Sequence, residues 1–321
     1  MLKSLCTTSW QVSGINGVWK NRDAHPPPIL DLIDLDIPSL GYTRFISSWL
    51  FRGDGENFLV DPGPACTIGT LLAALDARQV DRLDWILLTH IHLDHAGGVG
   101  DLIQRYPEAT VVCHEKAVSH LVDPERLWKG SLKILGDVAR VYGQMTPIPE
   151  ENIAVLDAIP AAGGIRVIPT PGHAAHHQCF VLDDLLFCGE LFGIFHQLEN
   201  GVYLRPATPK IFVLEDFLAS MDAVAPYMDR RRICFSHYGV SDDGADILTT
   251  ARHQLKCWVD VISRHRHDPD MDRIMGALSE KDPVYARKTM LPEVLYQREM
   301  HFSVNSINGI LHYLTEKKDR P

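Results

Sequence analysis

The spacing of apolar residues predicts alternating strands and helices over about the first 240 residues. Short apolar runs bounded by glycine, proline or polar residues predict strands at residues 29–36, 43–51, 58–61, 85–89, 165–170, 178–182, 185–188 and 232–235. Apolar residues three and four positions apart predict helices at residues 68–78, 99–106 and 214–225. Thr67 stands where it can cap the first of these helices. Strands that alternate with helices in this way are typical of an α/β fold.

The pattern changes after about residue 243, where the β-type runs end. Apolar residues recur at helical spacing over residues 246–263 and again over 304–314, so the last part of the chain is predicted to be all helical. We therefore divide the chain into an N-terminal extension over residues 1–25, an α/β domain over 26–242 and a helical cap over 243–321.

The composition is that of a folded, acidic protein. Of the 321 residues, 45% are hydrophobic and 22% are charged, which argues against intrinsic disorder and provides for a full core. The formal net charge of -10 argues against nucleic acid as a partner, because phosphate backbones are bound by basic surfaces.

The cysteines and the apolar runs bear on the compartment. The seven cysteines are scattered without a CxxC pair, and most stand in apolar surroundings, as expected of free thiols in a reducing compartment. Residues 1–20 lack the apolar core of a signal peptide, and no run approaches the roughly 20 apolar residues that span a bilayer. We expect a cytoplasmic protein that has no membrane partner.

Histidine is present in surplus, with 16 in the chain, and three of these residues stand in one short motif. His90, His92, Asp94 and His95 directly follow the apolar run at 85–89. His90 and His92 alternate along extended backbone and so point the same way, and a tight turn brings Asp94 and His95 close to them. Imidazole and carboxylate groups are ligands that zinc and ferrous iron accept. The motif predicts a metal site, because so many buried polar groups are costly without a cation.

On this motif the chain resembles the metallo-β-lactamase superfamily, whose HxHxDH signature is matched by His90, His92, Asp94 and His95. Three further motifs stand where the family pattern has them: Val60-Asp61-Pro62-Gly63, Thr170-Pro171-Gly172-His173 and Phe235-Ser236-His237-Tyr238-Gly239. The resemblance runs from about residue 29 to residue 239. It implies an α/β fold of the αββα sandwich type, to which the C-terminal helices are appended.

The resemblance also implies how the ligands are divided. His90, His92 and His173 would form one metal site, Asp94, His95 and His237 the other, and Asp61 would orient a ligand imidazole from behind. At the bridging position the family normally has aspartate after glycine, whereas this chain has Gly189-Glu190, whose side chain is one methylene longer. We expect two divalent ions, zinc before iron or manganese. A single bound ion is the alternative that Glu190 leaves open.

The implied activity is that of a metal-dependent hydrolase, in which a metal-bound hydroxide attacks an ester-like bond. Asp94 would orient the water and carry its proton. Among substrates, a small acyl thioester or lactone is favoured over a β-lactam or a phosphodiester. The alternatives are an iron-dependent persulfide dioxygenase and a non-catalytic, metal-binding regulatory protein.

Several residues outside the motifs are weaker candidates for contacts with the substrate. Tyr238 and Arg205 could contact a substrate carbonyl or anion, and His177 and His196 could stand at the pocket wall, although ordinary packing or a surface ion pair explains each equally well. In the cap, Trp258, Met271, Met275 and Met290 are available to line an apolar tunnel or simply to form a core. An exposed apolar face on the terminal helices would favour a homodimer.

Overall fold

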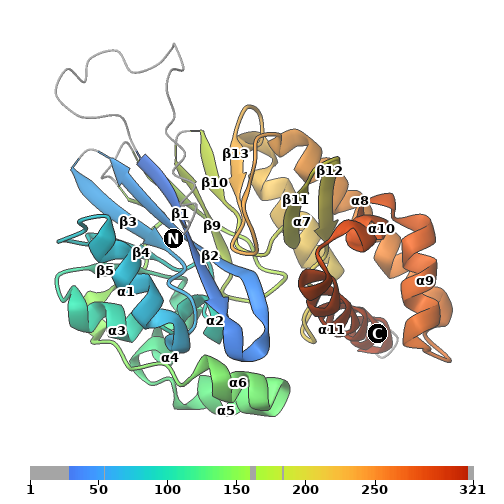
Figure 1. The fold of residues 1–321 in the computed structure, drawn as a ribbon, viewed down its shortest axis with the longest axis horizontal. Helices are drawn as coiled ribbons and strands as arrows, with labels where there is room; N and C mark the ends of the chain where they lie inside the picture. Colours follow the sequence, from blue (N-terminus) through green and yellow to red (C-terminus); the bar gives the residue numbers. More distant parts are fainter. Residues whose placement is uncertain (1–28, 54, 160–163, 183, 317–321) are drawn as a thin grey trace, which may run out of the picture.

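The computed structural model describes residues 29–53, 55–159, 164–182 and 184–316. The predicted N-terminal extension over residues 1–25 lies outside this range. Two six-stranded sheets pack face to face in the centre of the molecule, and helices cover their outer faces (Figure 1). This arrangement confirms the predicted α/β sandwich.

The first sheet contains the strands of the N-terminal half. It consists of β1 (Ile29–Ile37), β2 (Tyr42–Gly53), β3 (Glu56–Val60), β4 (Trp85–Leu87), β5 (Thr110–Val112) and β6 (Ile153–Ala154), which lie in that order. The first three strands pair antiparallel, and β3 to β6 pair parallel. The carboxyl ends of β3 and β4 therefore lie at the same edge of the sheet, and the loop that carries the histidine motif begins there.

The second sheet contains the later strands. It consists of β14 (Val240–Ser241), β13 (Arg232–Cys234), β10 (Leu185–Phe187), β9 (Gln178–Leu182), β8 (Ile165–Pro169) and β7 (Ala158–Ile159), in that spatial order. A separate hairpin is formed by β11 (Ile194–Leu198) and β12 (Gly201–Arg205). The sequence did not predict this hairpin.

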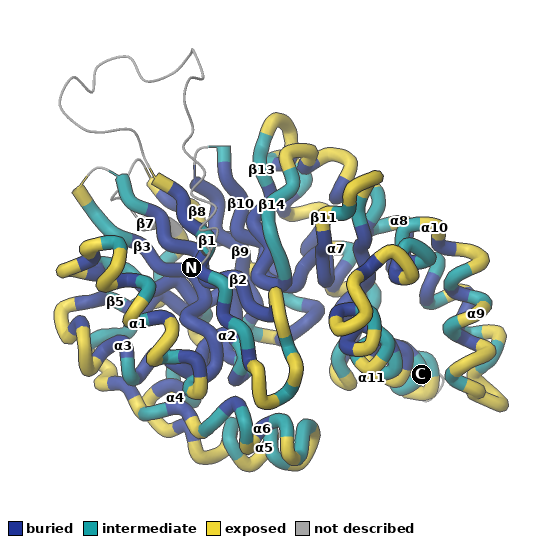
Figure 2. Tube along the Cα trace, viewed as in Figure 1, coloured by how far each residue is buried: buried dark blue, intermediate teal, exposed yellow. Residues whose placement is uncertain are grey.

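The layers are held together by three groups of buried apolar side chains. One group lies between the two sheets and includes Trp49, Phe58 and Phe187, a second packs the first sheet against its helices, and a third packs the second sheet against the C-terminal helices. Figure 2 shows the central strands as buried and the turns of the outer helices as exposed. The strands read as continuous apolar runs because both of their faces are covered.

The helices of the first half cover the first sheet. They are α1 (Ile68–Ala77), α2 (Leu93–Ala96), α3 (Val99–Arg105), α4 (Val118–Val122), α5 (Glu125–Leu135) and α6 (Asp137–Tyr142). The helices α4 to α6 were not predicted. Thr67 does not cap α1 as expected, because its hydroxyl donates to the carbonyl of Pro64 at 2.9 Å.

The chain ends in a helical region, as predicted. After α7 (Leu214–Val224) come α8 (Gly244–His265), α9 (Met271–Lys281), α10 (Pro283–Ala286) and α11 (Glu293–Glu316), which gather at one end of the molecule beside the β11–β12 hairpin (Figure 1). Among the described residues, no helix is both long and apolar enough to cross a membrane.

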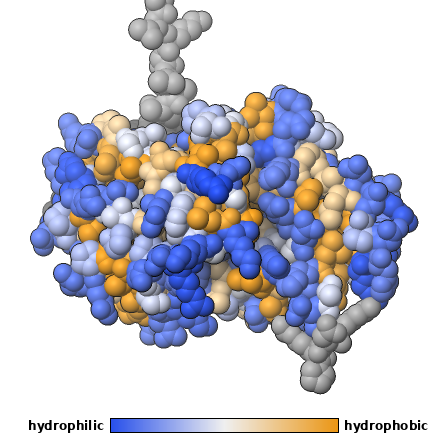
Figure 3. Space-filling view, turned by 90° about the horizontal axis from the view of Figure 1, so that it is seen from below, coloured by the Kyte–Doolittle hydropathy of each residue, from blue (hydrophilic) through white to orange (hydrophobic). Residues whose placement is uncertain are grey.

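The large apolar side chains that remain exposed are scattered. Among the described residues, those in the C-terminal helical region are Met290 and Val294. Figure 3 likewise shows apolar patches interrupted by polar ones on the face seen from below. The homodimer therefore stays a prediction that no continuous apolar face of the described terminal helices supports.

Candidate metal centre

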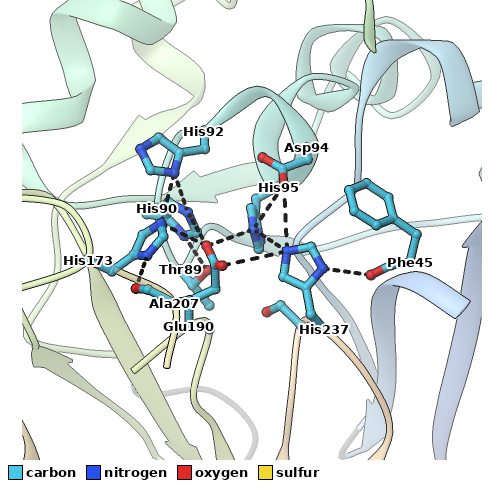
Figure 4. Close-up of polar contacts among 12 residues, drawn as sticks. Phe45, Thr89, His90, His92, Asp94, His95, His173, Glu190, Ala207 and His237 are labelled. Atoms are coloured by element: carbon cyan, nitrogen blue, oxygen red, sulfur yellow. Dashed lines mark hydrogen bonds and ion pairs between the residues drawn. The ribbon is translucent and has the colours of Figure 1, made fainter. Parts of the chain in front are cut away.

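The histidine motif occupies the turn between β4 and α2. His92 is the N-cap residue of α2, so His90 and His92 lie in extended backbone while Asp94 and His95 lie in the first turn of the helix. The strand ends at Leu87, earlier than predicted. The change from extended to helical backbone turns the side chains of this short segment toward two neighbouring points (Figure 4).

The first cluster consists of His90, His92, His173 and Glu190. The Nδ1 atom of His92 lies 3.1 Å from Nε2 of His90 and 3.0 Å from Nε2 of His173. His173 comes from the loop that follows β8, on the second sheet. The site therefore joins the two sheets across their shared edge.

The second cluster consists of Asp94, His95 and His237. The Nε2 atoms of His95 and His237 are 3.2 Å apart, and Oδ2 of Asp94 lies 3.8 Å and 3.6 Å from them. His237 follows β13 directly. The structure thus brings the histidines and Asp94 together in the same two groups that the resemblance implies.

Glu190 lies between the two clusters (Figure 4). Its Oε2 atom is 2.8 Å from Nε2 of His173, 3.3 Å from Nε2 of His90 and 3.4 Å from Nε2 of His95, and its Oε1 atom is 3.9 Å from Nε2 of His237. The glutamate therefore reaches both clusters from the position where the family normally has aspartate.

Gly189 makes this placement of Glu190 possible. Its φ of 53° lies in the left-handed region, and a Cβ atom there would meet His177 and Thr89. The backbone N–H of Glu190 donates to Nε2 of His177 at 3.1 Å, which holds the turn from behind. A residue larger than glycine at position 189 would displace the carboxylate.

The imidazoles are oriented as metal ligands. Nδ1 of His173 donates to the carbonyl of Ala207 at 3.0 Å, and Nδ1 of His237 donates to the carbonyl of Phe45 at 2.7 Å. His95 donates through Nδ1 to Asp61 at 3.0 Å. These bonds leave the Nε2 lone pairs free, and all three point into the clusters.

A divalent cation fits this donor set. The lone pairs of several nitrogen atoms face one another at 3.0–3.2 Å, an arrangement that is repulsive unless a proton or a cation lies between them. Ligand atoms bonded at about 2.0–2.1 Å to a tetrahedral zinc ion stand roughly 3.3 Å apart, close to the observed spacing. The seven side chains therefore form two candidate sites for divalent metal ions.

The charges of the cluster are those of a site that is ready for a cation. Burial and the neighbouring histidines hold the pKa of His90 well below its usual value, and burial with the adjacent His173 lowers the pKa of His92 to about 3. Burial alone would raise the pKa of Asp94, but His95 and His237 lower it to about 2. His90 and His92 are thus held neutral, and Asp94 is held ionised.

Asp61 supports the cluster from beneath. Its Oδ2 atom accepts hydrogen bonds from Thr89 Oγ1 at 2.7 Å, Ser236 Oγ at 2.7 Å and His95 Nδ1 at 3.0 Å, while Oδ1 accepts from the N–H of Thr89 at 2.8 Å. The carboxylate is fully buried. It contacts the ligand imidazole that the sequence led us to expect, and it also ties β4 to the motif that follows β13.

We expect the Asp61→Asn variant to bind zinc about 10–100-fold more weakly and to lose about 1–3 kcal/mol of unfolding free energy. The amide nitrogen cannot accept a hydrogen bond, so at least one of the four donors loses its partner. Chelator competition and urea denaturation measure the two effects. Asp84→Asn, at the opposite end of β4, is the control, and equal zinc affinity in both variants would contradict this role.

A cavity of about 630 Å³ opens from the metal clusters. One end is lined by His92, Asp94, His173, Glu190 and His237. The walls carry apolar side chains from three separate segments, among them Leu127, Ile134 and Leu135 of α5, Ile211, and Phe302 of α11. Basic groups from Arg126, Lys210, His120 and His312 also line it. The cavity therefore offers apolar side chains and basic groups in addition to the metal clusters at its end.

The proposed cap residues are not part of this lining. Trp258 is fully buried in the core, Met271 and Met275 pack against that core, and Met290 is about half exposed. Of the two interpretations that the sequence left open, packing in the core is the correct one for Trp258, Met271 and Met275, because α8 and α9 lie behind α11. Helix α11 instead contributes Phe302 and polar or small residues such as Ser306 and Gly309 to the lining.

Three of the four weaker substrate candidates do not line the cavity either. His177 is buried behind Glu190, His196 is buried and accepts a hydrogen bond from Arg298 at 2.9 Å, and the hydroxyl of Tyr238 donates to Asp34 at 3.2 Å. Their side chains are occupied within the protein. Arg205 does line the cavity, and its ion pair with Glu299 is buried rather than on the surface.

The partly buried position of Asp34 beside Asp36 leads to a pH effect. Burial and the adjacent Asp36 carboxylate raise the pKa of Asp34 to about 7, from its ordinary value of 3.8. Between these two pH values the folded chain keeps a proton that the unfolded chain releases, so stability falls as pH rises. Above about pH 7 the Asp34 carboxyl is ionised in both the folded and the unfolded chain, and the unfolding free energy falls no further.

We expect the Asp34→Asn variant to gain about 1–2 kcal/mol of stability over wild type as the pH rises from 5 to 8, because asparagine cannot ionise. Urea denaturation at each pH measures this difference. Asp81→Asn, an exposed acid, should show no such trend. A constant difference between Asp34→Asn and wild type at every pH would be inconsistent with the raised pKa.

The sequence missed the residues of α11 that border the site. Glu299, Ser303 and Ser306 are polar, buried and spaced four and three positions apart, so they form a stripe on one helix face. Such a stripe interrupts the apolar pattern and was the available signal. The hydroxyl groups of Thr89 and Ser236, beside Asp61, gave no comparable signal.

The Metallo-beta-lactamase superfamily profile matches residues 41–237, more than half of the chain. Because the matched region contains both clusters and Asp61, the fold, the motif order and the site agree with this assignment. The chain belongs to the metallo-β-lactamase superfamily.

Individual relatives agree with this assignment. A metallo-β-lactamase fold-containing protein of Sulfurisphaera tokodaii is 31% identical over 188 residues, which cover 56% of this chain and 68% of the relative. A hydroxyacylglutathione hydrolase of Xylella fastidiosa is 32% identical over 193 residues, 59% of this chain and 57% of that enzyme. The chain therefore matches just over half of the length of this hydrolase.

Solved structures of the superfamily share the fold. An archaeal metallo-β-lactamase superfamily protein from Sulfolobus tokodaii superposes with a TM-score of 0.64 at 23% identity, covering 89% of this chain and 98% of that one. A metallo-β-lactamase family protein from Thermus thermophilus gives 0.63 at 23% identity, covering 90% and 94%. The coverage extends the likeness of fold into the C-terminal helices.

Proposed function

We propose that the protein is a metal-dependent hydrolase that acts on a small acyl thioester, with a lactone as the next candidate. The observation that carries the proposal is the pair of donor clusters joined by Glu190 at the end of an apolar cavity. Hydroxyacylglutathione hydrolases, which are among the relatives, take an acyl group bound to the sulfur of glutathione.

The residues that would hold the ions are His90, His92 and His173 on one side, Asp94, His95 and His237 on the other, and Glu190 between them. Zinc is the proposed metal, because imidazole with carboxylate is a donor set that it accepts. Divalent ions in these positions would supply a nucleophile from water near neutral pH and positive charge for the oxyanion that develops on the substrate.

Asp94 is the proposed acid–base residue. Its carboxylate lines the cavity and is about one-fifth exposed, whereas the side chains of His90 and His95 are fully buried. The carboxylate is held ionised by His95 and His237. Asp94 can therefore accept a proton from the attacking water and return it to the departing sulfur or oxygen.

The cavity supports an anionic acyl substrate. Apolar side chains of α5 and α11 face the acyl chain, while Arg126 and Lys210 offer charge to a carboxylate at the far end of the substrate. These two residues lie on different segments, so together they would hold an extended molecule whose reactive carbonyl reaches the metal clusters.

We expect the double variant Ile134→Asp with Ile211→Asp to raise the KM for an acyl thioester about tenfold and to leave kcat nearly unchanged. Both residues line the cavity and are well exposed, at 72% and 63%, so they can be changed with little cost to folding. Each loses part of the roughly 1.5–3 kcal/mol of a buried aliphatic contact. Val122→Asp, exposed but outside the lining, is the control, and a fall in kcat alone would contradict the assignment.

Substrate turnover tests the proposed function. Protein loaded with zinc is assayed on S-lactoylglutathione, an acyl-CoA, a homoserine lactone and nitrocefin. We expect hydrolysis of a thioester, its loss on chelation and its return with zinc. The persulfide dioxygenase alternative predicts one iron per chain and oxygen uptake on glutathione persulfide, and the regulatory alternative predicts metal binding without turnover of any of these substrates.

A further inference from the structure

Helix α11 contacts the two backbone segments that orient the metal-ligating imidazoles. Arg298 and Glu299 are neighbours on this helix, and their side chains are buried in the protein, at 6% and 1% exposure. They point to different segments, one in β2 and the other at the end of β12. The metal clusters lie between these segments.

Arg298 holds the segment that contacts His237. Its Nη1 atom donates to the carbonyl of Thr43 at 2.5 Å and to that of Arg44 at 3.1 Å. The next carbonyl, that of Phe45, accepts the hydrogen bond from Nδ1 of His237 at 2.7 Å. Three successive carbonyls are thus shared between one residue of α11 and one ligand of the second cluster.

Glu299 and Ser306 hold the segment that contacts His173. Glu299 accepts a hydrogen bond from Nε of Arg205 at 2.5 Å, and Nη1 of Arg205 donates to Ser306 Oγ at 3.2 Å. Ser306 Oγ donates to the carbonyl of Pro206 at 3.0 Å, and Thr208 Oγ1 donates to the carbonyl of Ser306 at 2.8 Å.

Ala207 lies between Pro206 and Thr208, and its carbonyl accepts a hydrogen bond from Nδ1 of His173 at 3.0 Å. The backbone on both sides of this carbonyl is therefore fixed to α11. A carbonyl that accepts from Nδ1 fixes the tautomer and the ring orientation of a ligand histidine. Any shift of this segment would therefore change the orientation of the His173 imidazole in the first cluster.

The buried ion pairs and hydrogen bonds that join α11 to the rest of the protein have a high desolvation cost. Arg205, Arg298 and Glu299 are all buried, and burying three charges costs desolvation energy that apolar packing would avoid. Burial alone would raise the pKa of Glu299, but the two arginines lower it to about 2, so the charges are fixed over the working pH range. A role in geometry explains the network better than a role in stability.

We propose that α11 is a positioning element for the metal centre, with Arg298 orienting His237 and the Ser306–Thr208 contact orienting His173. Glu299 joins the two branches through Arg298 and Arg205. The proposal rests on the metal centre described above and does not depend on the identity of the substrate.

The test is stepwise removal of zinc from the loaded full chain by a chromophoric chelator. His173→Ala and His237→Ala first assign the two release steps to the two clusters. Arg298→Met should then weaken the step that belongs to His237 by about tenfold, whereas Ser306→Ala with Thr208→Val should weaken the step that belongs to His173 by a similar factor. Cobalt absorption spectra of each variant should change in the same site-selective way.

Two controls separate positioning from loss of stability. Arg298→Lys, which keeps a donor, should recover part of the zinc affinity, and Ile310→Val, on the core face of α11, should lower the melting temperature without changing either step. Equal effects of both sets of variants on the two steps, or no effect on either, would overturn the proposal. A wild-type chain that binds no zinc would instead refute the metal centre itself.

Discussion

Replacement of Asp94 by asparagine is expected to lower kcat for thioester hydrolysis by about three orders of magnitude. Asparagine keeps the size and an acceptor oxygen, but it cannot take a proton from water. His90, His92 and His173 are untouched, so zinc should remain in the first cluster. Steady-state kinetics with parallel metal analysis measure both quantities.

The control for this variant is Asp101→Asn. Asp101 lies on α3, where its carboxylate accepts from Thr146 outside the cavity, and its replacement should leave kcat within about twofold of wild type. An Asp94→Asn enzyme that kept more than a tenth of wild-type kcat would exclude Asp94 as the acid–base residue. A loss of all zinc would make it essential as a ligand.

Replacement of Glu190 by glutamine is expected to cause the second large effect, a loss of zinc affinity. The carboxylate lies within 2.8–3.4 Å of Nε2 of His173, His90 and His95, and burial makes loss of its charge costly. Removing one partner of a buried ion pair costs about 3–5 kcal/mol, which at about 1.4 kcal/mol per tenfold corresponds to a decrease in zinc affinity of about 100- to 4,000-fold. We expect the metal content to fall from about two ions per chain to one or fewer.

Glu190→Asp tests the reach of the side chain. Aspartate keeps the charge but is one methylene shorter, so on this backbone it cannot stay close to both His173 and His237. We expect it to bind one zinc ion well and the second weakly, in contrast to Glu190→Gln, which weakens both. Two tightly bound ions in the aspartate variant would show that the extra methylene has no role in bridging.

The site could be predicted in large part because its residues are local in sequence or follow strands. Four ligands fall within six residues, and His173 and His237 each end a recognisable strand. Parallel and antiparallel strands of the two sheets then bring these ends to one edge. The role of Asp61 was implied by the resemblance to the superfamily, and its position directly after β3 brings it to the same edge.

The rest could not be predicted because it depends on long-range packing. The contact of Arg298 with the Thr43 carbonyl joins residues 255 positions apart, and neither residue has a local pattern that indicates the other. Tyr238 was expected in the pocket because it follows His237, yet its hydroxyl donates to Asp34 of β1. The pairing of β1 with β2, which no local pattern near Tyr238 indicates, places Asp34 there.

The C-terminal helices show the same limit. Their helical periodicity predicted α8 to within two residues at each end, but it identified only residues 304–314 of α11, which begins at Glu293. Which helix borders the cavity was not predicted, because Trp258 and the methionines are apolar, whereas α11 contributes polar residues such as Ser306 as well as Phe302 to the lining. Apolar residues in an amphipathic helix belong first to the core.

Metal analysis of the protein tests most directly whether it has two metal sites joined by Glu190. The full chain is freed of metal, exposed to excess zinc, separated from free zinc and analysed for zinc per chain. We predict about two tightly bound zinc ions, reduced to one or fewer in Glu190→Gln. No bound zinc, or a single ion that Glu190→Gln leaves in place, would contradict it.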